Sequence, residues 1–498
     1  MSASNKYVSV TLYDQSKRSA NYPRGFQSIL KRSCLGLMLM TLVPSFSIAK
    51  SAVFESSNQQ ANEIRSRADN TSKKKDSATL TNNKEIKRLT ADGAWCWFSG
   101  PRAIYLNNEN QEIITGWITS KGDLEAGVLK YDSKEVKVQR VVAKLDKDDH
   151  ANPGFVELSN HEVMMAYSKH FDHKVRINKT LDPVETLQFG PAMEHDIYDA
   201  EELERYPNRR VTYANPFRLE EENNRIYCFG RWTGYKPNIT WSDDDGQTFA
   251  KSKVFITNIP FDSNNRPYVC YHSDGQSKIH ILFTDGHPRN ESLNSVYYAC
   301  YEKGAFWRAD GTLICDMDNI PFEPEEATLV YKATKENGRA WIYDLIVNSE
   351  GHPVILYARY PEETAHFYHY TVFDGSQWID NRMCHAGKWF PQTPKGQVEP
   401  EPHYSAGMSL HPLKPGIVYL SRDVEGTFEI EKWVTSDMGK TWKNTAITQN
   451  SKYDNVRPLV PKNMKPDDPA VVLWMVNKKY RHYTDYKTRI NYLIDEEN

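Results

Sequence analysis

Short apolar runs of five to eight residues, each followed by Gly, Asp, Asn or Pro, recur along the chain from about residue 91 to residue 495. Runs of this length and composition, bounded by turn residues, are typical of β-strands, and a helical period is almost absent. Only 199–205 has a helical pattern. The clearest predicted strands are 112–119, 225–230, 278–284, 353–358 and 416–421. The pattern therefore predicts an all-β domain over residues 91–498.

The repetition of strand–turn–strand units over some 400 residues indicates how the sheets are arranged. A β-propeller closes its small sheets radially and leaves few exposed edges, and its sequence consists of such repeated units. We therefore expect a single β-propeller. The strand pattern alone is compatible with six to eight blades.

Two turns with the same residue pattern, Ser242–Phe249 and Thr435–Trp442, make the propeller prediction more specific. Each is an Asp box, in which an aspartate can accept hydrogen bonds from the amides of its own turn and a glycine supplies a positive φ. The closing aromatic residue is expected to pack under the hairpin. Such boxes shape hairpins and indicate the fold, not the chemistry.

The first 90 residues differ from the rest of the chain. Lys31 and Arg32 precede an apolar run at 34–43, and a small-x-small site follows at 47–49. This order predicts a signal peptide over 1–49, because the apolar run is too short to span a bilayer. Residues 50–90, rich in Ser, Asn and Lys, predict a disordered linker. We expect a bacterial protein that is secreted or periplasmic.

Composition narrows the classes of partner. The 498 residues carry a net charge of -3, so no overall field attracts nucleic acid or an anionic membrane. The chain has 29 Tyr, 19 Phe and 12 Trp, residues that suit both strands and the apolar faces of sugar rings. We expect neither a nucleic-acid nor a membrane partner, and a monomer.

Two histidines, a tyrosine and an arginine follow turns or end strands in the first half of the domain. His150 lies in a turn before one predicted strand, and His170 ends the next. Tyr213 precedes Asn-Pro, and Arg231 ends a later strand. Neighbouring strands can bring these four side chains to one face of a propeller. Each alone has a structural alternative, and Arg231 beside Trp232 would also fit a cation–π pair.

Several longer motifs resemble the BNR-repeat family that includes the propeller-type ulvan lyases of polysaccharide lyase families 24 and 25. The resemblance covers nearly the whole chain after residue 90. The motifs lie at 92–98, 101–103, 116–122, 148–150, 284–289, 304–311 and 455–458.

The resemblance implies a seven-bladed propeller with a shallow substrate canyon. It implies a lyase that cleaves ulvan, an acidic sulfated rhamnose–uronic acid polysaccharide, by β-elimination to leave unsaturated uronyl ends. By motif, His150, His170, Tyr213 and Arg231 match the catalytic set of that family. We expect Asn152, two residues after the 148–150 motif, and Arg289, the last residue of the 284–289 motif, to contact substrate.

These residue types suit the elimination. The C5 proton of a uronate is only weakly acidic beside an ionised carboxylate, so cations must neutralise that carboxylate. We expect His170 and Arg231 to hold it. Tyr213 would act as base and acid, because a neighbouring cation favours its phenolate, with His150 as its partner or as an alternative base. No cofactor is needed for this chemistry.

A bound metal is a separate expectation. His287, Cys300 and Cys315 offer imidazole and thiolate groups, a ligand set that suits zinc. The resemblance implies a structural zinc, and calcium is an alternative ion. A Cys300–Cys315 disulfide and a substrate-facing His287 are equally compatible with the sequence.

Two other functions are compatible with the same scaffold. A sialidase-like glycoside hydrolase would need three arginines around a carboxylate, for which Arg102, Arg289 and Arg457 are available, but no glutamate partner for a nucleophilic tyrosine is evident. A non-catalytic carbohydrate-binding propeller is the second alternative.

Overall fold

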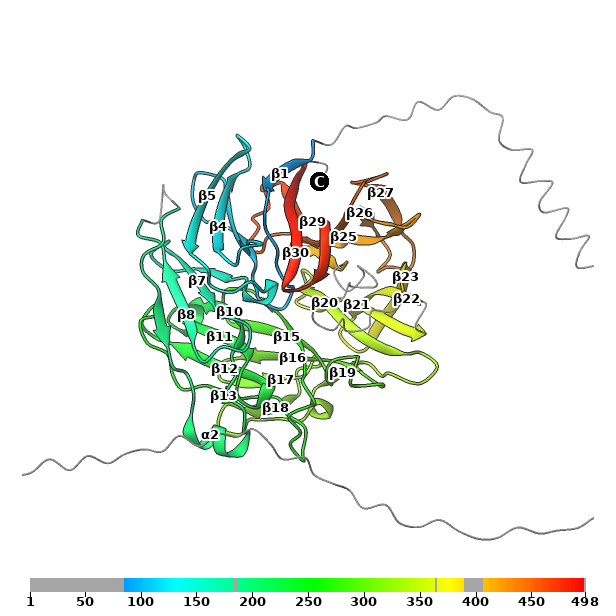
Figure 1. Cartoon of the computed structure of the whole chain (residues 1–498). Helices are drawn as coiled ribbons and strands as arrows, with labels where there is room; N and C mark the ends of the chain where they lie inside the picture. The colour runs from blue at the N-terminus through cyan, green and yellow to red at the C-terminus, as the bar shows by residue number, and fades with distance from the viewer. Residues whose placement is uncertain (1–84, 183–186, 363–364, 389–405, 497–498) are drawn as a thin grey trace, which may run out of the picture. The chain divides into compact units, whose positions relative to one another are not determined.

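The chain forms a seven-bladed β-propeller, seen in Figure 1 as small sheets arranged in a ring around one axis. The structure is a computed structural model that describes residues 85–182, 187–362, 365–388 and 406–496. The predicted signal peptide and linker residues 50–84 lie outside the described residues. The all-β, seven-bladed expectation is confirmed.

The first three blades each have four antiparallel strands paired in chain order. Blade 1 consists of β2 (Ala103–Tyr105), β3 (Glu112–Ile118), β4 (Leu124–Lys130) and β5 (Glu135–Val142). Blade 2 consists of β6 (Gly154–Glu157), β7 (Val163–Tyr167), β8 (Val175–Lys179) and β9 (Met193–His195). Blade 3 consists of β10 (Thr212–Leu219), β11 (Arg225–Arg231), β12 (Pro237–Ser242) and β13 (Lys253–Val254).

The next three blades continue round the ring, and blade 4 is enlarged to six strands. Blade 4 consists of β14 (Val269–Ser273), β15 (Lys278–Thr284), β16 (Val296–Glu302), β17 (Ala305–Trp307), β18 (Leu313–Asp316) and β19 (Thr328–Tyr331). Blade 5 consists of β20 (Arg339–Val347), β21 (Pro353–Glu362), β22 (Ala365–Phe373) and β23 (Trp378–Gly387). Blade 6 consists of β24 (Met408–His411), β25 (Lys414–Val424), β26 (Thr427–Val434) and β27 (Lys443–Ala446).

The seventh blade joins the two ends of the domain. It contains β28 (Asp454–Leu459), β29 (Ala470–His482) and β30 (Asp485–Asp495), and its outer strand is β1 (Lys87–Thr90). Blue β1 therefore lies beside red β30 in Figure 1. The propeller begins before residue 91, so the last residues assigned to the linker are a strand. The sequence of β1 is polar because β1 is a short edge strand in which one residue, Leu89, is buried.

Helices are short and few in the described ranges. The one α-helix there, α2 (Ala200–Arg205), begins at Asp199, whose side chain accepts from the amides of Glu201 and Glu202, as an N-cap does. The 3-10 turns are η1 (Asp149–Ala151), η2 (Glu220–Glu222), η3 (Thr233–Tyr235) and η4 (Pro324–Glu326). No helix in this part of the chain has the length and apolar character to cross a membrane.

The two predicted Asp-box turns have the same hydrogen bonds. Asp244 accepts from the amide and hydroxyl of Thr248 at 2.8 and 2.6 Å, and Asp437 accepts from those of Thr441 at 2.9 and 2.6 Å. The glycines of both turns have a positive φ, 79° and 84°. The closing ring of Trp442 packs edge-on against Tyr370 of the preceding blade, at 5.3 Å. The turns therefore fasten one blade to the next.

The hydrophobic core lies between blades. Buried residues of blade 2 pack against those of blade 3, including Met164, Ile177, Ile226 and Trp232. Similar clusters join the other neighbouring sheets. Because both faces of each inner strand are covered, β3 and β7 are buried along their whole length. The first strand of each blade lines the axis, and the candidate site lies at the start of the first strand and the end of the second strand of blades 2 and 3.

Candidate active site

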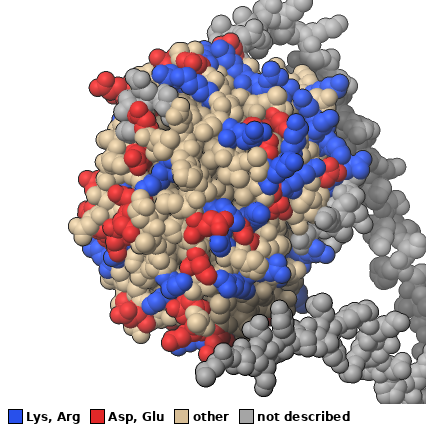
Figure 2. Space-filling view, turned by 60° about the vertical axis from the view of Figure 1, so that its left-hand side comes forward, with Lys and Arg blue, Asp and Glu red and all other residues tan. Residues whose placement is uncertain are grey.

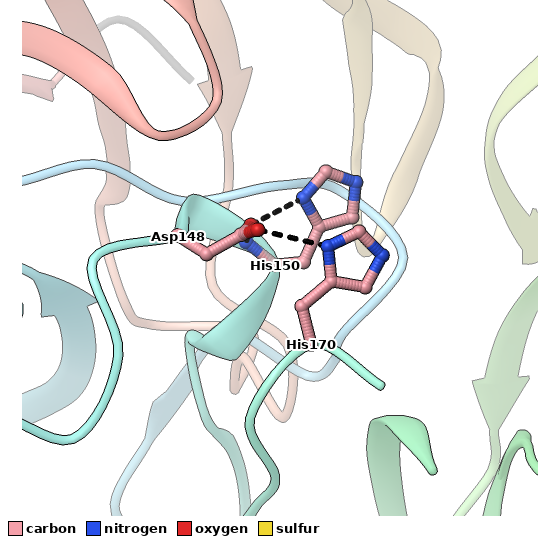
Figure 3. Close-up of side chains that lie close together, drawn as sticks. All are labelled: Asp148, His150 and His170. Carbon is pink, nitrogen blue, oxygen red and sulfur yellow. Dashed lines mark hydrogen bonds and ion pairs between the residues drawn. The ribbon is translucent and has the colours of Figure 1, made fainter. Parts of the chain in front are cut away.

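One carboxylate holds both predicted histidines. In the η1 turn, Asp148 Oδ1 lies 2.8 Å from His150 Nδ1 and also accepts the amide of His150 at 3.0 Å. Asp148 Oδ2 lies 2.8 Å from the Nδ1 of His170, which follows β7. Figure 3 shows the consequence: both Nε2 atoms point away from Asp148, toward the same side. The carboxylate thus orients two imidazoles side by side.

The two rings have different protonation states. Burial opposes a charge on His150, but the nearby sulfur of Cys96 and the carboxylates of Asp148 and Asp149 outweigh it and raise the pKa of His150 well above its usual value. Burial, together with the charge on His150, lowers the pKa of His170 to about 4. At neutral pH, His150 is therefore an imidazolium. His170 is a neutral imidazole whose Nδ1–H donates to Asp148 and whose Nε2 carries a lone pair.

A bulge in blade 3 directs Tyr213 toward these histidines. Thr212 pairs with Arg231, and the register between β10 and β11 shifts before Asn215. Tyr213 lies in this bulge with φ 69°, a strained conformation for a tyrosine. Its carbonyl accepts from Trp232 Nε1 at 3.0 Å. Its ring centroid is 5.9 Å from that of His150.

Arg231 completes the set of four predicted residues. Its guanidinium lies 5.1 Å from the ring centroid of Tyr213 and donates to the hydroxyl of Tyr268 at 2.7 Å. It also lies over the ring of Phe171, which stacks on His170 at 4.0 Å. The η2 turn connects β10 to β11 at the end of the hairpin opposite to Arg231.

The last blade contributes side chains that the sequence analysis did not assign to the site. Arg457 forms a buried ion pair with Asp149 at 2.7 Å, and the hydroxyl of Tyr480 donates to the same Oδ2 at 2.5 Å. Tyr483 packs edge-on against both histidine rings, at 4.8 Å from His150 and 5.5 Å from His170. The 455–458 motif, which contains Arg457, was the one feature of the sequence that pointed to this blade as part of the site. Residues more than 300 positions apart in the chain thus form one site.

With this geometry established, the sequence matches the family described as "BNR repeat-containing family member" over residues 113–385. The chain belongs to the BNR repeat-containing family. A search of curated proteins finds no match.

Among solved structures, this BNR-family chain is similar to an ulvan lyase of polysaccharide lyase family 25, bound to -[GlcA(1-4)Rha3S]-. The TM-score is 0.62 at 14% identity, over 83% of this chain and 96% of that one. The same kind of lyase without the oligosaccharide gives 0.62 at 13% identity, over 83% and 96%. A further polysaccharide lyase gives 0.49 at 11%, over 82% and 97%. At these identities, the likeness to the two structures with a TM-score of 0.62 establishes a common fold.

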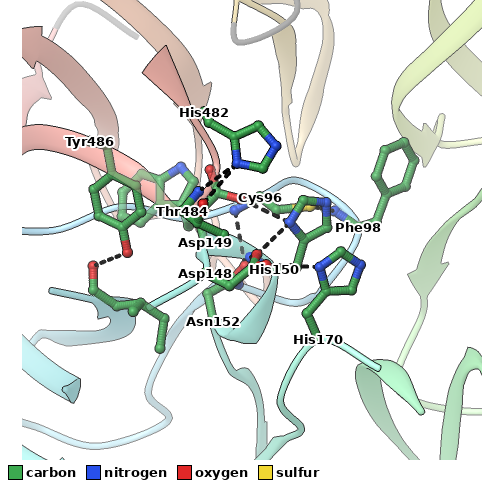
Figure 4. A network of polar contacts seen from close by, with 12 residues as sticks. Cys96, Phe98, Asp148, Asp149, His150, Asn152, His170, His482, Thr484 and Tyr486 are labelled. Carbon is green, nitrogen blue, oxygen red and sulfur yellow. Dashed lines mark hydrogen bonds and ion pairs between the residues drawn. The ribbon is translucent and has the colours of Figure 1, made fainter. Parts of the chain in front are cut away.

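The prediction for Asn152 is wrong. Its side chain is 1% exposed, and its Oδ1 accepts the amide of Cys96 at 3.0 Å. Its Nδ2 donates to the carbonyls of Ser99 and Pro153. Asn152 therefore holds the 96–99 turn against η1, as Figure 4 illustrates, and has no surface for a substrate. A buried turn residue and a ligand look alike in the sequence.

The predicted metal ligands are not brought together. Cys300 lies opposite Trp307, whereas Cys315 lies opposite Phe306. Because successive strand residues point to opposite faces, the two sulfurs lie on different sides of the sheet, in separate core clusters. Both are free thiols. This arrangement excludes a shared metal site and a Cys300–Cys315 disulfide.

His287, the third predicted ligand, lies beside the candidate site. Its ring is 5.4 Å from Tyr268 and 5.1 Å from Trp341. Burial and the charge of Arg231 lower the pKa of His287 to about 3, so it is a neutral imidazole. Its role, substrate-facing or metal-binding, stays a prediction.

Asp148, His150 and His170 are the group in the described ranges whose possible metal-ligand atoms lie within 4.8 Å of one another. Both Nδ1 atoms are, however, bonded to the carboxylate oxygens of Asp148. These contacts account for the close spacing without an ion. The carboxylate of Asp148 therefore orients both imidazoles through Nδ1, and their Nε2 atoms are left to contact a ligand.

The three arginines considered for a hydrolase are used differently. Arg457 is 3% exposed and pairs with Asp149. Arg102 lines a cavity on the propeller axis, and Arg289 is exposed. Since Arg457 is engaged by a buried carboxylate, the three do not form an open arginine triad. Arg289 remains a predicted substrate contact at the surface, near His287.

Proposed function

We propose that this chain is a polysaccharide lyase that cleaves ulvan by β-elimination at its uronic acid. The observation that carries the proposal is the group of one charged and one neutral imidazole, His150 and His170, next to Tyr213 and Arg231. Such a set combines cations for a carboxylate with groups that can move a proton. β-Elimination of a uronate requires both.

The cations would neutralise the carboxylate of the uronate. We assign this to Arg231, which is always charged, and to His150, whose Nε2 points away from Asp148 and whose pKa is raised in part by Asp148 and Asp149. This differs from the sequence-based assignment, which gave the role to His170. The charge on the carboxylate would otherwise prevent loss of the C5 proton, because the intermediate would carry two negative charges.

Tyr213 would remove the C5 proton and return a proton to the departing O4. Its ring centroid lies 5.1 Å from the guanidinium of Arg231 and 5.9 Å from the ring centroid of His150, and neighbouring cations favour a phenolate. The bond from C5 to hydrogen and the bond from C4 to oxygen then break, and a C4–C5 double bond forms. His170, which is neutral, would accept a hydrogen bond at Nε2 and orient the sugar beside the base.

The assignment of ulvan as substrate is supported by two further features. The solved lyase with a TM-score of 0.62 is bound to a glucuronate linked to a sulfated rhamnose. In addition, Figure 2 shows that Lys and Arg side chains gather on one side of the surface although the net charge is -3. A local positive surface attracts an acidic sulfated chain. Export by the predicted signal peptide and action as a monomer are part of the proposal.

The test is to incubate the full chain with ulvan and to follow ultraviolet absorbance of the unsaturated uronate together with new reducing ends. A lyase produces both signals in step. Reducing ends without absorbance would indicate hydrolysis, and binding without either would indicate a carbohydrate-binding propeller; each would overturn the proposal. A sulfated polysaccharide without uronic acid is the control substrate and should give neither signal.

A further inference from the structure

A small cavity lies on the propeller axis, apart from the candidate active site. Its lining includes residues from the first strands of several blades: Asn215, Cys270, Asp344, Ser409 and Leu459. The space open to the centres of water-sized spheres is about 50 Å³. A single water needs roughly 10–15 Å³ by that measure, so the cavity has room for an ion and a few waters.

The guanidinium of Arg102 is a cation of this cavity. Among the described residues, its side chain donates one hydrogen bond, from Nη1 to the carbonyl of Cys96 at 3.2 Å. No carboxylate lies within ion-pair distance of Arg102 among the described residues. Burial lowers the pKa of Arg102 to about 10, which leaves it charged at neutral pH. A guanidinium has five N–H donors, so most of them are available to a ligand in the cavity.

The second cation of the cavity has a carboxylate partner. Lys462 Nζ lies 2.8 Å from Asp344 Oδ1. Asp344 also accepts from the amides of Leu345 and Leu410 at 2.9 Å and from the hydroxyl of Ser409 at 3.2 Å. Its oxygens are therefore occupied, and Asp344 neutralises Lys462. The lining of the cavity keeps one positive charge in excess, that of Arg102.

A hydroxyl donor lines the same cavity. Ser99 is fully buried, and its Oγ has no hydrogen-bond partner among the described residues. A buried hydroxyl without a partner costs roughly 1–3 kcal/mol, so such groups usually bind an ion or a water. Arg102 and Ser99 thus provide a positive charge and a hydroxyl donor to the same cavity. Ser99 belongs to the turn that Asn152 holds against η1.

We propose that the axial cavity binds one small monovalent anion of the halide class, held by the guanidinium of Arg102 and the hydroxyl of Ser99. The excess of one positive charge matches one negative charge. A halide is small enough for the space and accepts several N–H and O–H donors at once. The other titratable groups at the lining, such as Cys270, whose pKa burial raises, are neutral and offer no competing charge.

The anion would act on stability, not as a substrate. Phe98 lines the cavity and also contacts Tyr213 and Tyr268 of the candidate site, at 5.9 and 4.8 Å. An ion bound to Arg102 would neutralise a charge where strands of five blades meet. The anion would bind the folded chain and not the unfolded chain. The folding equilibrium constant is therefore multiplied by one plus the ratio of the anion concentration to Kd.

The test is thermal unfolding of the full chain in sodium chloride or bromide against sodium gluconate at equal ionic strength. We expect a saturable rise, about tenfold in the folding equilibrium constant at tenfold excess over Kd. Crystals soaked in bromide should show an anomalous peak beside Arg102. Equal curves in halide and gluconate, without that peak, would overturn the proposal. So would stabilisation by sulfate or phosphate alone.

Variants separate this site from general salt effects. Arg102→Gln should abolish the saturable halide effect, and Ser99→Ala should weaken halide affinity several-fold while the chain stays folded. Arg140→Gln, at a side chain that is 62% exposed, is the matched control and should keep the full response. A halide response that persists unchanged in Ser99→Ala and Arg102→Gln would refute the assignment. If Arg102→Gln does not fold, Ser99→Ala and the bromide peak decide.

Discussion

The imidazole rings of His150 and His170 lie parallel, with centroids 4.4 Å apart and planes 8° apart, and each bonds to a different oxygen of Asp148. Two stacked imidazoles cannot both be protonated without strong repulsion. The additional carboxylate of Asp149, 3.1 Å from His150, is one of the groups that favour the charge on this ring. One pair thus supplies a cation and a neutral imidazole.

We expect His170 to make folding stability depend on pH. Its pKa is lowered to about 4, so between pH 6.5 and 4 the unfolded chain binds a proton that the folded chain does not. The stability contribution is complete above pH 6.5 and is lost as pH falls, by about 2 kcal/mol at pH 5. Urea unfolding at pH 7 and pH 5 measures this loss.

His170→Asn should remove that part of the pH dependence. The control is His161→Asn, at an exposed histidine paired with Glu157, which should keep the wild-type difference. An unchanged difference in His170→Asn would contradict the assigned protonation state.

Asp148→Asn should remove the shared acceptor of both imidazoles. Loss of the carboxylate lowers the pKa of His150, so the imidazolium that neutralises the uronate is lost at a lower pH. We expect kcat to fall by about 10²-fold or more and the alkaline limb of the kcat/KM profile to move to lower pH. Pre-steady-state and steady-state lyase assays across pH measure both.

A matched control for that variant is Asp485→Asn, an outlying carboxylate that pairs with Lys479. It should leave the profile unchanged. A drop in kcat with an unshifted alkaline limb in Asp148→Asn would mean that Asp148 orients the rings without setting their charge.

Tyr213→Phe tests the base. Removal of the hydroxyl deletes both proton transfers and should lower kcat by about 10²–10⁴-fold, with oligosaccharide binding largely retained. Tyr453→Phe, at the residue that precedes β28 of the last blade, is the control and should be fully active. Near-normal elimination by Tyr213→Phe would transfer the role of base to His170, whose Nε2 lone pair is the other available acceptor.

Arg457→Met should be strongly destabilising, because it leaves Asp149 buried without its partner. We expect a loss of about 3–5 kcal/mol in the free energy of unfolding, recovered in part by adding Asp149→Asn. The exposed pair Arg225–Asp243 gives the comparison, with a change below about 1 kcal/mol for Arg225→Met. Denaturant unfolding of the single and double variants measures the coupling. Strictly additive losses would contradict it.

Much of this architecture is predictable from the sequence because a propeller is built from local units. Strand–turn–strand runs and two turns such as Ser242–Phe249 each form from neighbouring residues, and the predicted strand at 278–284 is observed unchanged. His150, His170, Tyr213 and Arg231 also come together as expected. His150 and Tyr213 lie at the start of the first strand of blades 2 and 3, and His170 and Arg231 lie at the end of the second strand. The local strand pattern is therefore enough to align them.

The errors arise where position depends on partners distant in the chain. Whether Cys300 and Cys315 face one another depends on strand register, which their spacing does not reveal. The roles of Arg457 and Tyr483 depend on the ring bringing its last blade beside its first. The charges of the two histidines depend on Asp149, whose own state is set by Arg457.

The strand pairing of β1 with β30 has a consequence for synthesis of the protein. Asp149 is translated early, but its cation and the tyrosine that covers both imidazoles belong to the last blade. A nascent chain that still lacks this blade cannot close the ring or hold the η1 turn in place. The candidate site is therefore assembled only after β28, β29 and β30 have been synthesised.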